Sequence, residues 1–297
     1  MIYIRSVLLH LRIPFSFFLM PVYLFALGMS PNFSESRLMW SFVIIHLLLY
    51  PASNGFNSYF DKDEKSIGGL MHPPPVNKGL YYVSLLFDVL AIVLGFLKIN
   101  MLFALMLLIY GLVSKAYSHP SIRVKKYPVR GWLVIGIFQG IFTFLMCYAG
   151  INGFEVENLL QAKVLIPGML SSLMLWGNYP MTQVYQHEED AKHGDITISM
   201  KLGIRGTFVF VQIMFAVAAS CFVLYFHHFY TMEMVFAFLI ALAPVVIYFM
   251  FWFYKIWKDV SQANFLHTMW LNFISSFCLN GFFIYFWLAN SHIGQYF

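Results

Sequence analysis

The sequence predicts an all-α membrane protein, a bundle of nine transmembrane helices with polar cytoplasmic loops capping a central cavity. Three observations predict this fold. Hydrophobic residues make up 60% of the 297 residues and charged residues only 10%, whereas soluble domains carry roughly 25% charge. The apolar residues form runs of about 20, long enough for a helix to cross a bilayer. Lys and Arg concentrate in alternate polar breaks, as in the cytoplasmic loops of membrane proteins.

Nine apolar runs follow one another with only short polar breaks. In chain order they cover 8–28, 37–60, 79–97, 101–119, 131–149, 164–187, 207–226, 233–254 and 268–289. The first run begins behind Arg5 and reaches the second without a small-residue cleavage site, so we expect it to remain as a helix. No linker rich in Pro, Gly or Ser divides the chain, so residues 1–297 are expected to form one domain.

Every second break is charged. The second, fourth and sixth runs close at the loops 61–78, 119–130 and 188–206. If the N-terminus is inside, 15 of the 18 Lys and Arg residues lie on the cytoplasmic side. This asymmetry predicts a cytoplasmic N-terminus, cytoplasmic motif loops and an external C-terminus. The net charge of +5 then follows from topology, so we expect the lipid bilayer and no nucleic acid as a partner.

Two similar segments lie 129 positions apart: YPASNGFNSYFD from Tyr50 and YPMTQVYQHEED from Tyr179. Each closes an apolar run and opens a charged loop. Polar side chains recur at i, i+3 and i+7, namely Asn54, Asn57 and Asp61 in the first copy and Gln183, Gln186 and Asp190 in the second. On a helix each set forms one polar stripe. Such stripes also join helices in lipid, but the carboxylate at the same end of both copies favours a site for a cation or a polyanion.

The first acidic cluster suits Mg²⁺, a hard cation that prefers oxygen ligands and completes its shell with water and phosphate oxygens. Asp61, with Asn57 one turn behind it, is the stronger pair of candidates. Asp63 and Glu64 are almost equally well explained as a solvated loop.

The second cluster contains Gln186, where an Asp would bind a metal more strongly, and Asp190. We expect Glu189 or its neighbour Glu188 to compensate as a ligand. His187 and His193 lack the paired His or Cys spacing of a metal site and are interpreted as loop residues.

A basic set lies between the two clusters and comprises Lys115, Arg123, Lys125, Lys126 and Arg130. Cations beside carboxylate clusters are expected where a diphosphate bridges them, because they neutralise oxygens that the metal does not reach. The topology rule and anionic lipids also account for basic loops on this face.

Polar residues continue from both stripes into the membrane. His46 and Tyr50 do so in the second run, and Asn178 and Thr182 in the sixth. Asp88, in the middle of the third run, is expected to face the bundle interior, protonated or paired, since a charge there costs about 2.5–3.5 kcal/mol. Together these residues predict a pocket that is polar at its mouth and becomes apolar with depth.

These motifs resemble those of the UbiA-type membrane prenyltransferases, which carry NDxxDxxxD after the second helix and DxxxD after the sixth. Asn57 and Asp61 match the first motif, and Gln186 and Asp190 fall on the second. The segment Gly194, Thr197, Leu202 and Gly203 resembles the family's trailing G-x-x-T...L-G pattern. Tyr117-Ser118-x-Pro120 with Lys125 resembles its YSxP...K segment, and Arg12-x-Pro14 its opening Arg and Pro.

The resemblance covers nearly the whole chain and implies a site. It implies transfer of a prenyl group from an isoprenoid diphosphate, held through Mg²⁺, to a small lipophilic acceptor, commonly an aromatic or quinone precursor. Catalysis is expected from Asp61, Asp190, Tyr117 and Lys125. Substrate binding is expected from Asn54, Arg123, Lys126, Gln183, Lys192 and Arg12. Metal binding is expected from Asn57, Asp61, Gln186, Glu189 and Asp190. The expected location of the protein is the bacterial inner membrane.

Departures from the family motifs leave alternatives open. Ser58, Lys65 and Gln186 replace acidic positions, so Asp63, Glu64 and Glu189 take over or catalysis is altered. A UbiA-type terpene cyclase would act on the prenyl diphosphate without an acceptor. A non-catalytic transporter or lipid-binding protein would place its polar groups near the midplane, whereas both carboxylate motifs lie at one mouth. A CDP-alcohol phosphotransferase needs a long multi-Asp motif that is absent from the sequence.

Overall fold

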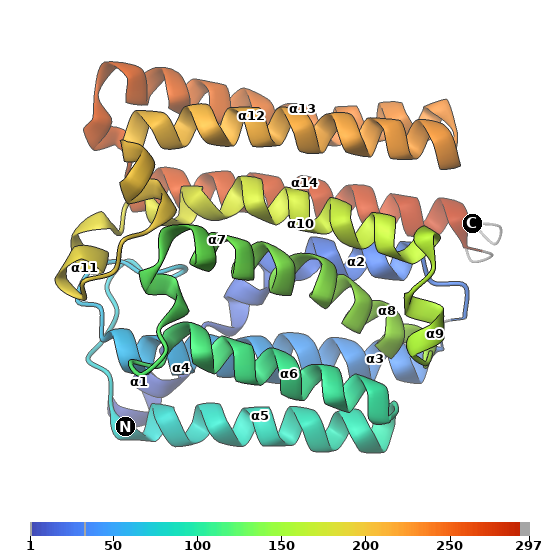
Figure 1. The fold of residues 1–297 in the computed structure, drawn as a ribbon, viewed down its shortest axis with the longest axis horizontal. Coiled ribbons are helices and arrows are strands. Elements are labelled where there is room, and N and C mark those ends of the chain that lie inside the picture. Colours follow the sequence, from blue (N-terminus) through green and yellow to red (C-terminus); the bar gives the residue numbers. More distant parts are fainter. Residues whose placement is uncertain (1, 33, 292–297) are drawn as a thin grey trace.

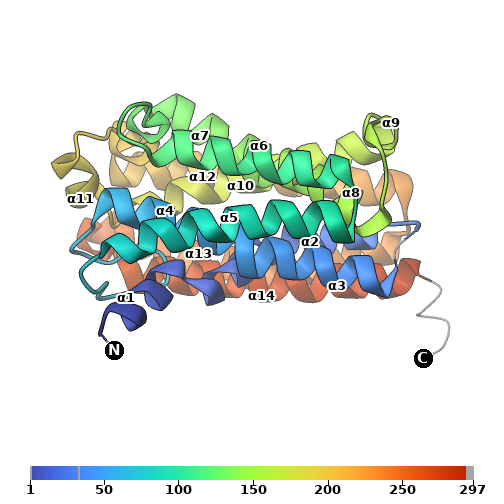
Figure 2. The ribbon, with the colours of Figure 1, turned by 90° about the horizontal axis from the view of Figure 1, so that it is seen from below.

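The computed structural model describes residues 2–32 and 34–291. Long helices run side by side along one axis in this part of the chain (Figures 1 and 2). Eight of the described helical segments are long and apolar enough to cross a membrane. The predicted run 164–187 corresponds to α10 (Ala162–Gln183), whose Pro, Ser, Gly and Asn residues lower its hydropathy. α1 begins at the end of the bundle that carries α11, and α14 ends at the other, as nine crossings require (Figure 1).

The two N-terminal crossings are each built from three helical pieces, where the sequence predicted one continuous helix. The first comprises α1 (Ile2–Leu11), the 3₁₀ helix η1 (Ile13–Leu19) and α2 (Met20–Gly28). The second comprises α3 (Glu35–Val43), the π-helix η2 (Ile44–Leu49) and α4 (Tyr50–Asp61). Arg12 breaks the first crossing because its φ of 48° is left-handed, and Pro14 then opens η1.

The middle of the chain forms three more crossings. They are α5 (Lys78–Lys98), α6 (Met101–Ser118) and the composite of α7 (Pro128–Gly136), the π-helix η4 (Ile137–Phe142) and α8 (Thr143–Asn152). The side chains of Asn77 and Asn100 cap α5 and α6 by accepting backbone N–H bonds. The short η3 (Val124–Lys126) precedes α7 and carries the basic segment.

The C-terminal part supplies the remaining helices. They are α9 (Val156–Leu159), α10, α11 (His187–Lys192), α12 (Ile198–Phe229), α13 (Met232–Lys258), η5 (Val260–Gln262) and α14 (Phe265–Asn290). The polar stripe predicted for Gln183, Gln186 and Asp190 on one helix is wrong. α10 ends at Gln183, a turn follows, and α11 is a separate short helix. The first stripe is confirmed, because Asn54, Asn57 and Asp61 all lie in α4.

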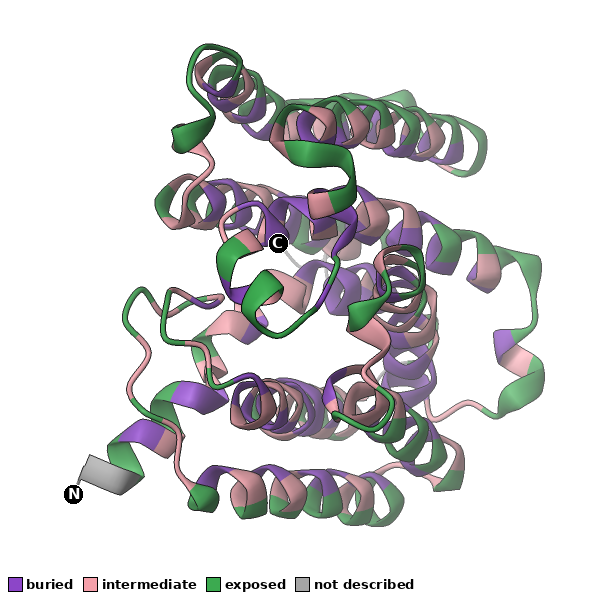
Figure 3. Cartoon of the chain, turned by 60° about the vertical axis from the view of Figure 1, so that its left-hand side comes forward, coloured by how far each residue is buried: buried purple, intermediate pink, exposed green. Residues whose placement is uncertain are grey.

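Aromatic side chains from α2, α8, α12, α13 and α14 form much of the larger core cluster. Phe25 on α2 stacks on Phe283 of α14, with ring centroids 4.6 Å apart, and contacts Phe144 and Phe222 from α8 and α12. The outer faces carry exposed residues (Figure 3), and many of the exposed residues are large and apolar. Ile240 on α13 is 72% exposed. This pattern suits lipid contact outside and a packed core inside.

A buried ion pair joins α5 to α6. Asp88 is 8% exposed and pairs with Lys115, whose ammonium also lies 5.2 Å from the centroid of the Phe56 ring. The prediction that Asp88 faces the interior, paired, is confirmed.

Gly140 sets the distance between η4 and α10. Its backbone is non-helical (φ −94°, ψ −105°), and a Cβ there would lie 2.4 Å from the Ser172 Cα. Gly140→Ala should therefore force the helices apart and cost about 1–3 kcal/mol, lowering the thermal unfolding midpoint of the detergent-solubilised protein by several degrees. Gly281→Ala on α14 is the matched control, since nothing lies within 4 Å of its added Cβ. Equal midpoints for the two variants would contradict this packing.

Candidate active site

A cavity of about 260 Å³ opens where α4, α6, α10 and α14 meet the loops at the α11 end. The segments between the long helices contribute residues from 63–68, 125 and 185–197, and η1, α7 and η4 complete the walls. Figure 3 looks onto this end of the bundle, with the loops grouped over it. The lining is charged where the loops converge and mostly aromatic and apolar deeper between the helices, so the predicted gradient of polarity is observed.

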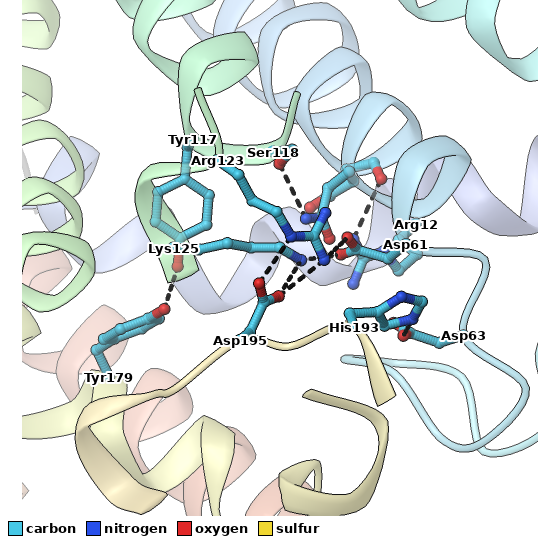
Figure 4. Close-up of polar contacts among 12 residues, drawn as sticks. Arg12, Asp61, Asp63, Tyr117, Ser118, Arg123, Lys125, Tyr179, His193 and Asp195 are labelled. Atoms are coloured by element: carbon cyan, nitrogen blue, oxygen red, sulfur yellow. Dashed lines mark hydrogen bonds and ion pairs between the residues drawn. The ribbon is translucent and has the colours of Figure 1, made fainter. Parts of the chain in front are cut away.

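Two carboxylates and two cations form a compact cluster at the mouth (Figure 4). Arg123 donates two hydrogen bonds to the Asp195 carboxylate, at 2.7 and 2.8 Å, and its guanidinium lies 3.4 Å from Asp61. Lys125 pairs with Asp61 and lies 3.7 Å from Asp195. The two cationic side chains are 12% exposed and the two carboxylates 5% and 1%. At this depth each charge needs its partner.

At two further carboxylates of the mouth, Asp190 and Asp63, the surroundings disfavour the charged form. Burial, reinforced by neighbouring carboxylates, raises the pKa of Asp190 to about 7. Burial and Asp61 raise the pKa of Asp63 to about 6. Raised pKa values in a cluster of acids indicate a site that is short of positive charge.

The loop after α4 is fastened to α11. Lys65 pairs with Glu188, and the Glu64 backbone N–H donates to Glu189 at 3.2 Å. His193 lies 3.6 Å from Asp63. Lys65 and Glu188 are both solvent exposed, so their pair adds little stability but joins the two motif loops. Lys65, which replaces an acidic residue of the family motif, therefore has a partner in this protein.

Arg12 and Asn57 fix the α4 side of the cavity. Arg12 donates to the Gly68 carbonyl at 3.2 Å and to the Asn54 carbonyl at 3.3 Å. Asn57 donates to the Ser118 hydroxyl at 3.0 Å. Arg12, Lys62 and Arg123 are the non-Gly residues with positive φ in the described chain, and all three lie at this mouth. Such backbone strain clusters at functional sites.

Tyr117 on α6 and Tyr179 on α10 meet across the cavity, and their hydroxyls are hydrogen bonded (Figure 4). Tyr179 opens the second sequence segment, and Tyr117 belongs to the YSxP segment. Both residues belong to the cavity lining.

The structure brings most of the predicted site residues to this cavity. Its lining includes Arg12, Asn54, Asn57, Asp61, Tyr117, Lys125, Gln183, Gln186 and Asp190. Arg123 reaches the cluster through Asp61 and Asp195. Two predictions are displaced, because Lys126 and Lys192 are exposed outside the lining. Glu189 also lies outside the lining and is 2.6 Å from Lys192, but its carboxylate lies within 4.8 Å of ligand atoms of Asp63 and His193, a group that could hold a metal ion.

Sequence reasoning missed Asp195 and Tyr179. Asp195 is 2% exposed and holds Arg123 across 72 positions in the chain. The available signal was its place in the same charged loop, five residues after Asp190. Tyr179 was noticed only as the start of the repeated segment.

Comparison with known proteins identifies the class. The model of the UbiA prenyltransferase family matches residues 17–276, so the chain belongs to this family. The resemblance inferred from the motifs is confirmed. Since members of the family are prenyltransferases, the chain is a multi-pass membrane enzyme of that class. None of the curated proteins compared with the chain matches it in sequence.

Solved structures share the fold at low sequence identity. A UbiA homolog from Archaeoglobus fulgidus bound to GPP and Mg²⁺ is 19% identical, with a TM-score of 0.66, over 95% of this chain and 99% of that one. The apo structure of a UbiA homolog from Aeropyrum pernix K1 is 16% identical, with a TM-score of 0.71, over 92% and 98%. A digeranylgeranylglyceryl phosphate synthase is 22% identical, with a TM-score of 0.60, over 96% and 98%.

Removing one partner of the Arg123–Asp195 pair should destabilise the fold. Arg123→Met leaves the buried Asp195 with only the more distant Lys125, at an expected cost of about 3 kcal/mol. The double variant Arg123→Met/Asp195→Leu should recover much of this loss, because no buried charge is left unpaired. Unfolding of the purified protein in detergent measures both. Lys126→Met, at the exposed neighbour, is the control, and an equal loss in that variant would argue against the pairing.

Proposed function

We propose that this protein transfers a prenyl group from an isoprenoid diphosphate to a small, aromatic or quinone-precursor acceptor within the membrane, with Mg²⁺ as cofactor. One observation carries the proposal: Asp61 and Asp190, the acidic ends of the two repeated segments, line the same cavity as Lys125 and Arg12. Carboxylates alone would suit a cation and cations alone an anion. Their mixture suits a metal-bound polyanion.

The residues at the mouth fit Mg²⁺. Asp61, Asp63 and Asp190 offer carboxylate oxygens and Asn57 and Gln186 amide oxygens, the hard donor set that this ion prefers. The raised pKa values of Asp63 and Asp190 mark a place where added positive charge is favourable. When bound, Mg²⁺ supplies the positive charge that lets a diphosphate depart as a leaving group.

Lys125 and Arg12 are the proposed diphosphate ligands, assisted by Arg123. Lys125 is paired with Asp61, and Arg12 with two backbone carbonyls. We propose that donor binding exchanges these partners, so that Lys125 moves from the Asp61 carboxylate to phosphate oxygens. Arg123 stays with Asp195 and keeps the basic segment at the mouth.

The reaction balances without an outside oxidant or reductant. The allylic C–O bond breaks and its electron pair leaves with the diphosphate. An acceptor atom gives an electron pair to the allylic carbon, and its proton passes to the released diphosphate. The aromatic faces of Tyr117 and Tyr179 stabilise the developing carbocation, while the fastened loops 61–65 and 186–193 exclude water that would trap it.

The orientation predicted from the Lys and Arg distribution places this mouth in the cytoplasm, and that topology, like the bacterial inner membrane, belongs to the proposal. One observation supports this topology: the described loops 61–77, 119–127 and 184–197 lie at the end of the bundle where α1 begins (Figure 1). A water-soluble diphosphate head group would then be taken from the cytoplasmic side.

Asp61→Asn and Asp190→Asn should each abolish Mg²⁺-dependent release of diphosphate from a prenyl diphosphate, because each removes a ligand and a charge that the leaving group needs. The expected loss is at least about 100-fold. Glu157→Gln on α9, at the opposite end of the bundle, serves as control and should retain activity. Full turnover by both Asp variants, with normal folding in detergent, would reject the proposed site.

Metal affinity should fall as the pH is lowered. Asp190 and Asp63, with pKa values of about 7 and 6, are protonated below those values and must lose their protons to bind a metal. Between pH 8 and pH 6 the Mg²⁺ concentration for half-maximal turnover should rise about tenfold. In Asp190→Glu the pH dependence of this Mg²⁺ concentration should move to the pH at which the new carboxylate loses its proton. A flat profile over this range would contradict the raised pKa of Asp190.

A further inference from the structure

Three amide side chains from three different elements line the cavity below its charged mouth. They are Gln139 on η4, Asn178 on α10 and Asn272 on α14. Asn178 precedes Gln183, at the end of α10, by five residues, or roughly 7.5 Å along the helix. The charged residues of the lining belong instead to helix ends and loops at the mouth. The deeper cavity therefore has three amides among mostly aromatic and apolar residues, and the charged residues of the lining lie outside it.

The hydrogen bonding of these amides is incomplete. Asn178 donates from Nδ2 to the Oδ1 of Asn272 at 3.3 Å. The Asn178 Oδ1 is buried and has no partner among the described residues. Turning both amides over would reverse the bond and still leave one Asn178 atom unpaired. Gln139 makes no side-chain hydrogen bond within residues 2–32 and 34–291.

One buried amide outside the cavity is fully hydrogen bonded. Asn152, at the other end of the bundle, accepts from the Asn32 backbone N–H at 2.9 Å and donates to Ser30 and to the Tyr148 carbonyl, both at 2.8 Å. Its donors and acceptor are all used. Leaving a buried acceptor unpaired costs about 1–3 kcal/mol. Asn280 on α14 also has an Oδ1 that is unpaired within the described chain but does not line the cavity, so it is the unpaired oxygen of Asn178 together with its place in the cavity lining that points to a ligand.

The π-helix η4 aims Gln139 at the same space. Its irregular turn, with the non-helical Gly140 packed on Ser172, places Gln139 in the lining. Short π-helical segments are frequently found at functional sites. Phe138 and Tyr110 also line this part of the cavity and offer flat faces to a ring.

We infer that Gln139, Asn178 and Asn272 form the acceptor subsite, and that the acceptor is a small ring compound with an uncharged hydrogen-bonding substituent such as a hydroxyl. This inference rests on the proposed function. A hydroxyl can donate to the unpaired Asn178 oxygen and accept from an amide N–H. A carboxylate only accepts, and it would sit in the deeper cavity without a cation, since Arg12 and Lys125 are the basic residues of the lining and lie at the mouth.

The test compares three acceptors that share one ring: hydroquinone, 4-hydroxybenzamide and 4-hydroxybenzoate, each with geranyl diphosphate and Mg²⁺. The wild-type protein should favour the two uncharged acceptors over the carboxylate by at least about tenfold in kcat/KM. Asn178→Leu and Gln139→Leu should each raise the acceptor KM by about fivefold to tenfold, as loss of a hydrogen bond in a buried site predicts. The Kd for the donor, measured by binding of labelled geranyl diphosphate, should not change.

Asn280→Leu is the control, because it removes a buried amide from α14 that does not line the cavity. It should leave the acceptor KM unchanged. Diphosphate release with unaltered acceptor KM in both Leu variants, or with a preference for 4-hydroxybenzoate, overturns the acceptor subsite alone. If the products formed from the donor are the same with and without an acceptor, the acceptor subsite is overturned as well. No Mg²⁺-dependent diphosphate release under any condition overturns the proposed function and this inference together.

Discussion

The pairing of opposite charges at the mouth of the bundle is the interaction on which the site depends. Asp61 and Asp195 are almost fully buried where water cannot stabilise them, and Lys125 and Arg123 are the cations that make this possible. For a metal-bound diphosphate to enter, Lys125 and Asp61 have to separate, while Arg123 stays with Asp195. Without a ligand, the opposite charges of this cluster neutralise one another and keep the mouth folded. Because the Lys125–Asp61 pair can exchange partners, the same two side chains can bind a ligand.

The backbone around this cluster is shaped by breaks in the helices. Arg12 ends α1 in a left-handed conformation, Lys62 does the same after α4, and Arg123 turns the chain into η3. Continuous helices would carry these side chains along the bundle wall. The breaks instead direct the chain across one end of the bundle, so residues far apart in sequence meet over the cavity. The aromatic core supplies the rigid support for these irregular segments.

Much of this could be predicted from the sequence. The lengths of the apolar runs locate the crossings, and the repeated segments locate Asp61 and Asp190 at one cavity. The second stripe was wrong because Gln186 and Asp190 keep a helical spacing that extends beyond the end of α10, and nothing local shows that the chain turns after Gln183. Asp195 and Asn272 were missed because their partners, Arg123 and Asn178, come from distant elements, and Gln139 was missed because it lines a cavity that distant elements form.

The most direct test is a structure of the protein with Mn²⁺ in place of Mg²⁺ and a geranyl S-thiolodiphosphate, which cannot readily ionise. We expect metal density between Asp61 and Asp190, with Lys125 moved from Asp61 to the diphosphate and Arg123 still on Asp195. A diphosphate bound elsewhere, or a metal held by only one of the two repeated segments while Lys125 remains on Asp61, would contradict it.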